Sequence, residues 1–232
     1  MKKMVFLGVF ALLAMPQSTQ AAVVLAVDNF RNLNPGDPPA YIVQDSIDLI
    51  ISRTNIGLNS IGSTDGTFGS LASPAASTGT ANSSESFRWV NGIATATLDF
   101  AFTDTSGADR SLTTFHFDSG ATRPNAARNF ELFLVDGMTE TSLASDVIPS
   151  AGAATPTYAD FDLGLGGLTL AANSTVNLSL RFTGGDGSGG HHGHFDNLAL
   201  SAVAIAVPEP SSAAIIGLIG IYGLVRRRRT AA

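Results

Sequence analysis

The densest group of potential metal ligands in this sequence is a histidine-rich run near its C-terminal end. Three histidines, His191, His192 and His194, are followed by Asp196. Side chains alternate between the two faces of an extended strand, so His192, His194 and Asp196 would share one face. Two imidazoles and a carboxylate on one face could bind a metal ion. The alternative is a solvated turn between two strands, because the only other histidine, His116, lies far away in the sequence.

The sequence contains none of the common catalytic motifs. It lacks the Gly-x-Ser-x-Gly turn of a serine hydrolase and the His-Glu-x-x-His helix of a zinc protease. None of its 19 acidic residues lies in a context typical of a glycosidase acid or base. The glycine-rich run 184–190 precedes a predicted strand, whereas a phosphate-binding loop precedes a helix. We therefore expect that the protein is not an enzyme.

The first 21 residues are typical of a secretory signal peptide. Lys2 and Lys3 precede an apolar run at 5–15, and a polar stretch at 16–20 leads to small residues that end at Ala21. We predict that signal peptidase cleaves after Ala21. The alternative is an N-terminal membrane anchor, which requires about 20 apolar residues and so more than this run provides.

Residues 207–232 form a second targeting segment with three parts. Two prolines around a glutamate come first, an apolar stretch at 213–225 follows, and an arginine cluster comes last: Pro208, Glu209 and Pro210, then Arg226, Arg227, Arg228 and Arg229. The prolines prevent a helix from continuing out of the preceding strand. The arginines cannot be buried, but they fit the cytoplasmic face of the inner membrane. We predict a helix at 213–225 that holds the precursor in the inner membrane transiently.

These three parts, in this order, resemble the PEP-CTERM sorting signal of Gram-negative bacteria. The resemblance implies recognition by a membrane transpeptidase of the exosortase type. Such an enzyme would cut near Pro208–Pro210 and release or transfer the protein to the cell surface or the extracellular matrix. The resemblance is confined to the C-terminal end, so it implies nothing about the activity of residues 22–206.

The body of the chain, residues 22–206, is acidic and contains no lysine. It has seven arginines against eighteen Asp and Glu residues, a formal charge of −11. Nucleic acid is not an expected partner, because no basic patch is available to displace counterions from phosphates. The absence of cysteine excludes disulfides and thiolate metal sites. A body of this length is sufficient for one domain. Without disulfides, we expect a hydrophobic core, alone or together with bound calcium, to stabilise it.

Short alternating or β-branched runs separated by turn residues predict an all-β fold for this body. We predict nine strands, at 23–30, 41–51, 86–90, 93–103, 112–118, 129–135, 158–163, 175–182 and 194–203. The run at 41–51 also suits one face of a helix. Residues 55–84 are rich in Gly, Ser, Thr and Ala and predict a long loop or insertion. The number of strands favours a single two-sheet sandwich of the jelly-roll type.

Three segments resemble parts of jelly-roll carbohydrate-binding modules: 129–137, 174–182 and 194–200. The last two are similar to the final hairpin of such modules, in which the closing strand carries an Asp-Asn pair, here Asp196 and Asn197. The resemblance implies a structural Ca²⁺ bound by Asp196 together with the first strand, where Asp28 is the natural partner. Carboxylates are suitable oxygen ligands for calcium. The alternative is that Asp196 and Asn197 form hydrogen bonds to the local backbone.

Sugar binding requires an aromatic side chain that can lie against the apolar face of a sugar ring. The aromatic residues are 14 Phe, three Tyr and one Trp, a composition more typical of a core. Trp89, Tyr41 and Tyr158 are the candidates with a polar group. Phe87 and Trp89 share one face of a predicted strand, and that face is either a sugar-binding platform or part of the core.

Together these features predict an exported protein of the cell surface or the extracellular matrix. We expect a non-catalytic structural or adhesive role with affinity for exopolysaccharide. The alternative is a secreted polysaccharide hydrolase or lyase built on the same jelly-roll scaffold.

Overall fold

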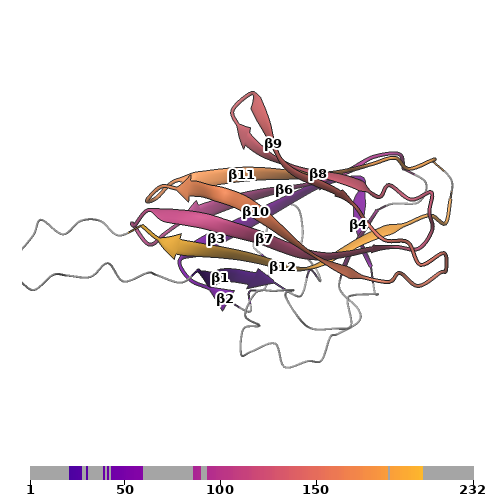
Figure 1. Cartoon of the computed structure of the whole chain (residues 1–232), viewed down its shortest axis with the longest axis horizontal. Helices are drawn as coiled ribbons and strands as arrows, with labels where there is room; N and C mark the ends of the chain where they lie inside the picture. The colour runs from indigo at the N-terminus through magenta and orange to yellow at the C-terminus, as the bar shows by residue number, and fades with distance from the viewer. Residues whose placement is uncertain are drawn as a thin grey trace, which may run out of the picture.

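The computed structural model describes residues 21–27, 30, 39, 41, 43–59, 86–89, 93–187 and 189–205. These residues form two antiparallel β-sheets that pack face to face (Figure 1). The predicted all-β, jelly-roll-like sandwich is therefore confirmed. Within these residues, no helix is long and apolar enough to cross a membrane. Apart from Ala21, the predicted signal peptide lies outside the described residues, and so does the sorting segment 207–232.

The larger sheet contains seven strands. They are β1 Ala22–Val27, β2 Val43–Gln44, β4 Ile56–Asn59, β5 Ser86–Trp89, β7 Arg110–Ala121, β10 Ala159–Leu170 and β12 Gly193–Ala204. Five of them follow the order β10-β7-β12-β1-β2, and β5 pairs with both β12 and β4. Strand β1 begins and β12 ends at the same end of the sandwich, because Ala22 pairs with Ala202 (Figure 1).

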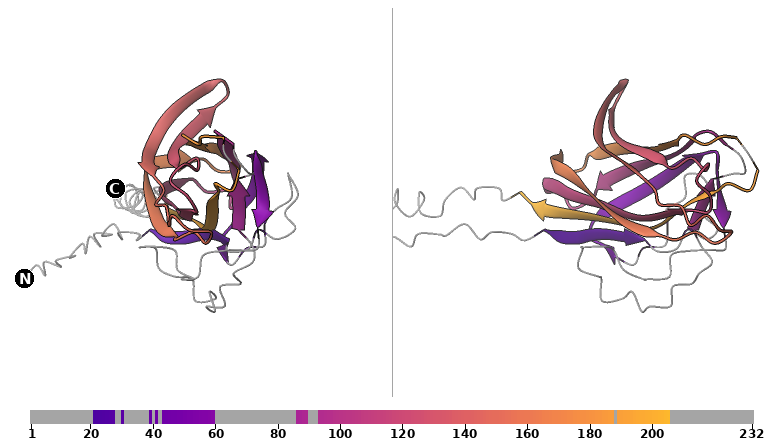
Figure 2. Two further views of the ribbon diagram at one scale, coloured as in Figure 1. Left: turned by 90° about the vertical axis from the view of Figure 1, so that its right-hand side faces the viewer. Right: turned by 45° about the vertical axis from the view of Figure 1, so that its right-hand side comes forward.

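The smaller sheet contains five strands. They are β3 Ile47–Thr54, β6 Ala96–Asp104, β8 Asn129–Asp136, β9 Thr139–Val147 and β11 Thr175–Thr183. Their order is β3-β6-β11-β8-β9. Figure 2 shows that the hairpin of β8 and β9 extends beyond the rest of the sandwich. As a result, no side chain of the edge strand β9 is buried.

Inward side chains of the two sheets meet in one core that is rich in phenylalanine. The alternation predicted for β6 is confirmed, since Leu98, Phe100 and Phe102 are buried and the residues between them are not. The largest fully buried side chains include Trp89, Phe30, Phe87, Phe100, Phe102, Phe115, Phe117, Phe182 and Phe195. Such a core needs no disulfide, in agreement with the absence of cysteine.

Three details of the structure differ from the predicted strands. The run 41–51 is extended, as predicted, but it is divided between β2 and the first part of β3. The predicted loop 55–84 begins with strand β4, which pairs with β5. Strand β9 has no counterpart among the predicted strands, because its exposed, mostly polar side chains show no apolar alternation.

Candidate functional site

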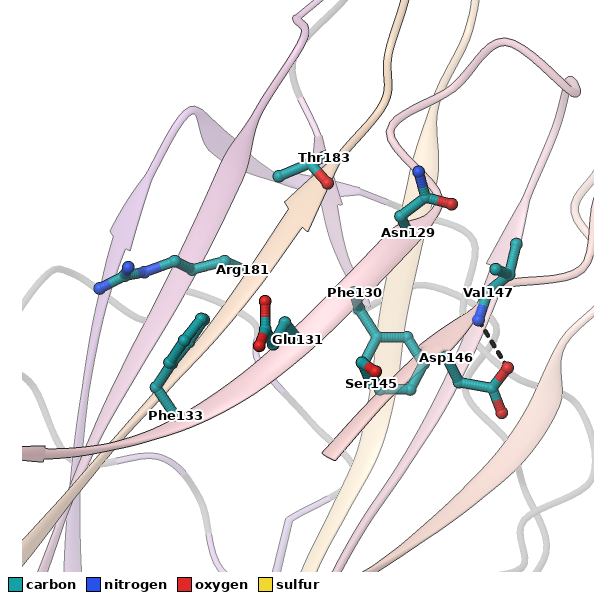
Figure 3. A pocket seen from close by; sticks show the side chains of 9 residues that line it. All are labelled: Asn129, Phe130, Glu131, Phe133, Ser145, Asp146, Val147, Arg181 and Thr183. Atoms are coloured by element: carbon teal, nitrogen blue, oxygen red, sulfur yellow. Dashed lines mark hydrogen bonds between the residues drawn. The ribbon is translucent and has the colours of Figure 1, made fainter. Parts of the chain in front are cut away.

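The outer face of the five-stranded sheet carries a hollow of about 470 Å³ formed by strands β8, β9 and β11. Figure 3 shows the side chains that line it: Asn129, Phe130, Glu131, Phe133, Ser145, Asp146, Val147, Arg181 and Thr183. Arg181 and Phe133 lie on one side of the view and Asp146 and Val147 on the other. We call this surface the sheet groove.

The alternation of β8 and β11 places these side chains on the groove. Leu132 is buried in the core, whereas its neighbours Glu131 and Phe133 face outward. Arg181 on β11 pairs in register with Glu131, and its guanidinium carbon lies 4.6 Å from the centre of the Phe133 ring. This stacking orients the guanidinium group while leaving several N–H donors available.

Arg181 is also held by Glu140 on β9, which it contacts through both terminal nitrogens. The hydrogen bond from Arg181 lowers the pKa of Glu140, and the hydrogen bond to Glu140 raises the pKa of Arg181. Glu131 accepts a hydrogen bond from the hydroxyl of Ser142. Hydrogen bonds therefore orient the side chains of Arg181 and Glu131, which both line the groove.

A second hollow of about 260 Å³ continues on the same face across β3, β6, β11 and β8. Both apolar and polar residues line it: Ile50, Ser52, Asp99, Phe100, Ala101, Val135, Asn177 and Leu178. Ile50 is 49% exposed. The two hollows share strands β8 and β11, so the polar side chains of this sheet form one extended surface rather than a closed pocket.

The seven-stranded sheet carries a separate cluster of carboxylates on the face opposite the core. Asp118 on β7 pairs in register with Asp160 on β10 and with Asp196 on β12, so three carboxylates form one row across adjacent strands. The neighbours Phe117, Phe161 and Phe195 point into the core. Asp118 and Asp196 are buried, whereas Asp160 is exposed.

His116 lies two residues before Asp118 on β7, and its side chain contacts two carboxylates. Its Nδ1 is 2.7 Å from Oδ1 of Asp162, and its Nε2 is 3.2 Å from Oδ1 of Asp118. Burial lowers the pKa of His116, but the close contacts with the negatively charged Asp118 and Asp162 outweigh it, and the pKa is raised. The ring is therefore oriented from both nitrogens.

A β-bulge in β12 brings an amide into the same cluster. The register between β12 and β7 shifts between Asp196 and Ala199, and Asn197 there adopts a positive φ of 44°. The side-chain nitrogen of Asn197 donates a hydrogen bond of 2.6 Å to Oδ2 of Asp118. The predicted Asp-Asn pair thus lies at a cluster of potential ligands, and Asn197 bonds to a side chain.

The predicted histidine set is not brought together by the structure. His191 contacts Asp186, the backbone N–H of His192 donates to the hydroxyl of Thr122, and the ring of His194 packs edge-on against Tyr158. Burial lowers the pKa of His194 to about 3, with the charges of His192 and Arg88 adding to the effect. Within the described residues, three potential ligands converge at His116, Asp118 and Asp160 instead.

Of the two alternatives for Trp89, a sugar-binding platform or a place in the core, the structure shows the second. The ring is 1% exposed, packs against Phe182 at 3.9 Å between ring centres, and donates a hydrogen bond to the carbonyl of Ala127. An aromatic ring in this position cannot present a face to a sugar. Tyr41 likewise uses its hydroxyl within the fold, at the backbone of Leu49.

Several predicted residues lie outside the described part of the chain. These are Asp28, the sorting motif Pro208, Glu209 and Pro210, and the cluster Arg226, Arg227, Arg228 and Arg229. Calcium binding by Asp28 and Asp196 therefore stays a prediction, as does the membrane helix at 213–225.

The sequence contains a pattern that includes His116, Asp118 and Asp160, although the histidine-rich run is the more conspicuous group of potential ligands. Polar and apolar residues alternate in the segment 115–118, Phe-His-Phe-Asp, and in the segment 160–163, Asp-Phe-Asp-Leu. Such alternation predicts polar side chains on the outer face of each strand. It does not predict which strands are neighbours, and therefore the cluster itself is visible only in the fold.

No protein-family model matches this sequence, and no curated protein matches it. Among solved structures, a family 29 carbohydrate-binding module from Piromyces equi shares 8% identity, with coverage of 79% of this chain and 91% of that chain and a TM-score of 0.35. A carbohydrate-binding module of a lichenase from Cellvibrio mixtus, in complex with cellotriose, gives 9% identity, coverage of 77% and 96% and a TM-score of 0.37. A cleaved adhesin domain of Lys-gingipain from Porphyromonas gingivalis shares 15% identity, with coverage of 78% of this chain and 99% of that chain and a TM-score of 0.40. TM-scores this low support no functional conclusion.

Proposed function

We propose that this chain is an exported surface or matrix protein that binds a polysaccharide without catalysis, through the sheet groove. The observation that carries the proposal is the groove itself. Its lining combines the outward side chains of β8, β9 and β11 with an aromatic ring, a guanidinium group and carboxylates on one open face. An open, shallow surface suits a chain-like ligand, whereas small ligands favour enclosed pockets.

The groove side chains match the hydrogen-bonding needs of sugar hydroxyls. Each hydroxyl is both a donor and an acceptor. The groove offers an acceptor on Asp146, and the second hollow beside it offers an acceptor on Asp99 and both kinds of group on Asn177. Phe133 adds apolar surface in the groove, and Ile50 adds apolar surface in the second hollow. The neighbouring strands fix these positions in register, so little side-chain order has to be gained on binding.

The charges in the groove favour binding over hydrolysis. A glycosidase needs one carboxylic acid with a raised pKa, which donates a proton to the leaving group. Beside this groove Arg181 lowers the pKa of Glu140, so this carboxylate is not such an acid. A hydrolase or lyase is the second candidate.

Purified full-length protein applied to a glycan array, with a parallel assay for reducing ends and unsaturated products, tests the proposal. We expect retention of one or more acidic or neutral polysaccharides and no new product. Product formation that is abolished by a single carboxylate substitution would favour the hydrolase or lyase.

Arg181→Ala is expected to weaken polysaccharide binding about 10-fold or more, because one charged donor in a binding site contributes about 1.5–3 kcal/mol. The matched control is Arg123→Ala, since Arg123 is exposed, bonds to the carbonyl of Gly152 and does not line the groove. Titration calorimetry with the best polysaccharide from the array measures both variants. Equal losses in the two variants would contradict a role for the groove.

We further propose that signal peptidase and an exosortase-type transpeptidase process the precursor at its two ends. The support is the order of the predicted targeting segments in the sequence, with Pro208–Pro210 before the apolar stretch 213–225 and the arginines. Mass spectrometry of the native protein should find Ala22 at the N-terminus and a C-terminus near Pro208. Secreted material that retains Arg226–Arg229 would contradict this.

A further inference from the structure

The three potential ligands on the seven-stranded sheet lie close enough to share one metal ion. One ligand atom each from His116, Asp118 and Asp160 lie within 4.8 Å of one another. With metal–ligand distances of about 2.0–2.2 Å, two ligands of one ion stand no more than about 4.4 Å apart. A movement of a few tenths of an ångström therefore brings the three atoms to bonding distance.

The imidazole of His116 is oriented as in many metal sites. Its Nδ1 lies 2.7 Å from Oδ1 of Asp162, while Nε2 points to Asp118 and the carboxylate row. A carboxylate that holds the far nitrogen of a metal-binding histidine fixes the ring and increases its basicity. Asp162 thus lies where a carboxylate would orient the ring without touching the metal, and Nε2 of His116 lies where it would bind the metal.

Asp118 is a buried carboxylate with one oxygen already fixed and the other directed at the cluster. Its Oδ2 accepts the hydrogen bond from Asn197, and its side chain is fully buried. Its Oδ1, 3.2 Å from Nε2 of His116, accepts no hydrogen bond of acceptable geometry from any residue that the structure describes. A buried carboxylate oxygen in this situation is stabilised by a cation.

The ligand types decide which cation fits. Calcium and magnesium take oxygen ligands, whereas an imidazole is preferred by Zn²⁺ and other first-row transition metals. Two carboxylates balance the two positive charges, and Asp196, in register with Asp118, adds negative charge beside them. We propose that His116, Asp118 and Asp160 bind a divalent transition metal ion of the Zn²⁺ class. The site lies on the sheet opposite the groove and is independent of polysaccharide binding.

Calorimetric titration of chelator-treated full-length protein with ZnCl₂, and separately with CaCl₂, tests this proposal. The histidine-rich run could bind zinc on its own, so His191→Gln/His192→Gln is the matched control. We expect this double variant to retain the zinc site of the wild-type protein. His116→Gln should lose it, and Asp160→Asn and Asp162→Asn should each weaken zinc binding about 10- to 100-fold.

Circular dichroism and melting temperatures complete this test. Asp160 is exposed, so Asp160→Asn is expected to fold even if His116→Gln does not, and circular dichroism checks both. Zinc should also raise the melting temperature of the wild-type protein but not that of His116→Gln or, at the same zinc concentration, of Asp160→Asn. Zinc binding that is unchanged in Asp160→Asn, or that is lost in the His191→Gln/His192→Gln control, overturns the proposal. So does binding of calcium with no binding of zinc.

Discussion

Replacing Phe117 by alanine is expected to lower the free energy of unfolding by about 3–5 kcal/mol, the range for a large aromatic removed from a packed core. The Phe117 ring lies within 5.1–5.9 Å of four other rings, measured between centres: Phe115, Phe130, Phe161 and Phe195. Phe130 belongs to the opposite sheet, so the substitution opens a cavity at the interface between the sheets. Urea denaturation followed by tryptophan fluorescence measures the loss.

Phe133→Ala is the matched control for this prediction. Phe133 faces the sheet groove and not the core, so its removal should cost no more than about 1 kcal/mol of stability. It should instead weaken polysaccharide binding, because the ring and the Arg181 stacked on it belong to the groove. A large stability loss in Phe133→Ala, or a small one in Phe117→Ala, would show that the two faces of the sandwich are assigned wrongly.

Asp104→Asn is expected to destabilise the protein by about 3 kcal/mol at pH 7, as is typical when one partner of a buried ion pair is removed. Asp104 is fully buried at the end of β6, and Nε of Arg110 lies 3.3 Å from one of its oxygens. Its carboxylate also accepts hydrogen bonds from the hydroxyl of Ser106 and from the backbone N–H groups of Gly107 and Asn173. This one side chain therefore connects two turns at the same end of the sandwich.

The pH dependence of this effect has a definite sign. Burial raises the pKa of Asp104, but the hydrogen bonds outweigh it, and the folded-state pKa lies below the usual value of 3.8. The stabilisation by the carboxylate is therefore complete above about pH 4 and is lost as the pH falls through the lowered pKa. Melting temperatures of wild type and Asp104→Asn should therefore converge as the pH falls further below about 4. A constant difference across this range would show that the carboxylate charge is not the stabilising feature.

Much of the fold could be predicted because the apolar residues alternate strictly in its central strands. The pattern Leu98, Phe100, Phe102 identifies β6, and the corresponding pattern at 176–182 identifies β11. Strand β9 could not be found in this way, since it is an exposed edge strand that pairs only with β8. Its position depends on the hairpin turn at Gly137, which has a positive φ of 58°, and not on burial.

The candidate sites could be predicted only in part, because they depend on register. The sequence predicts that Asp196 and Asn197 lie on the closing strand, and the structure places both in β12. That Asp118 and Asp160 lie beside Asp196 depends on the pairing of strands far apart in the sequence, which no local pattern specifies. For Trp89 the local pattern itself is ambiguous. Its alternation with Phe87 is equally consistent with a surface platform and with the core, where the structure places it.

Hydrogen–deuterium exchange of the full-length protein, with and without the polysaccharide identified on the array, tests the proposed binding surface most directly. Slower exchange on binding is expected in β8, β9 and β11, which form the sheet groove, with no change in β7 and β10 of the other sheet. Protection confined to β7, β10 and β12, or no protection in β8 and β11 at a saturating concentration of polysaccharide, would contradict the assignment of polysaccharide binding to this face.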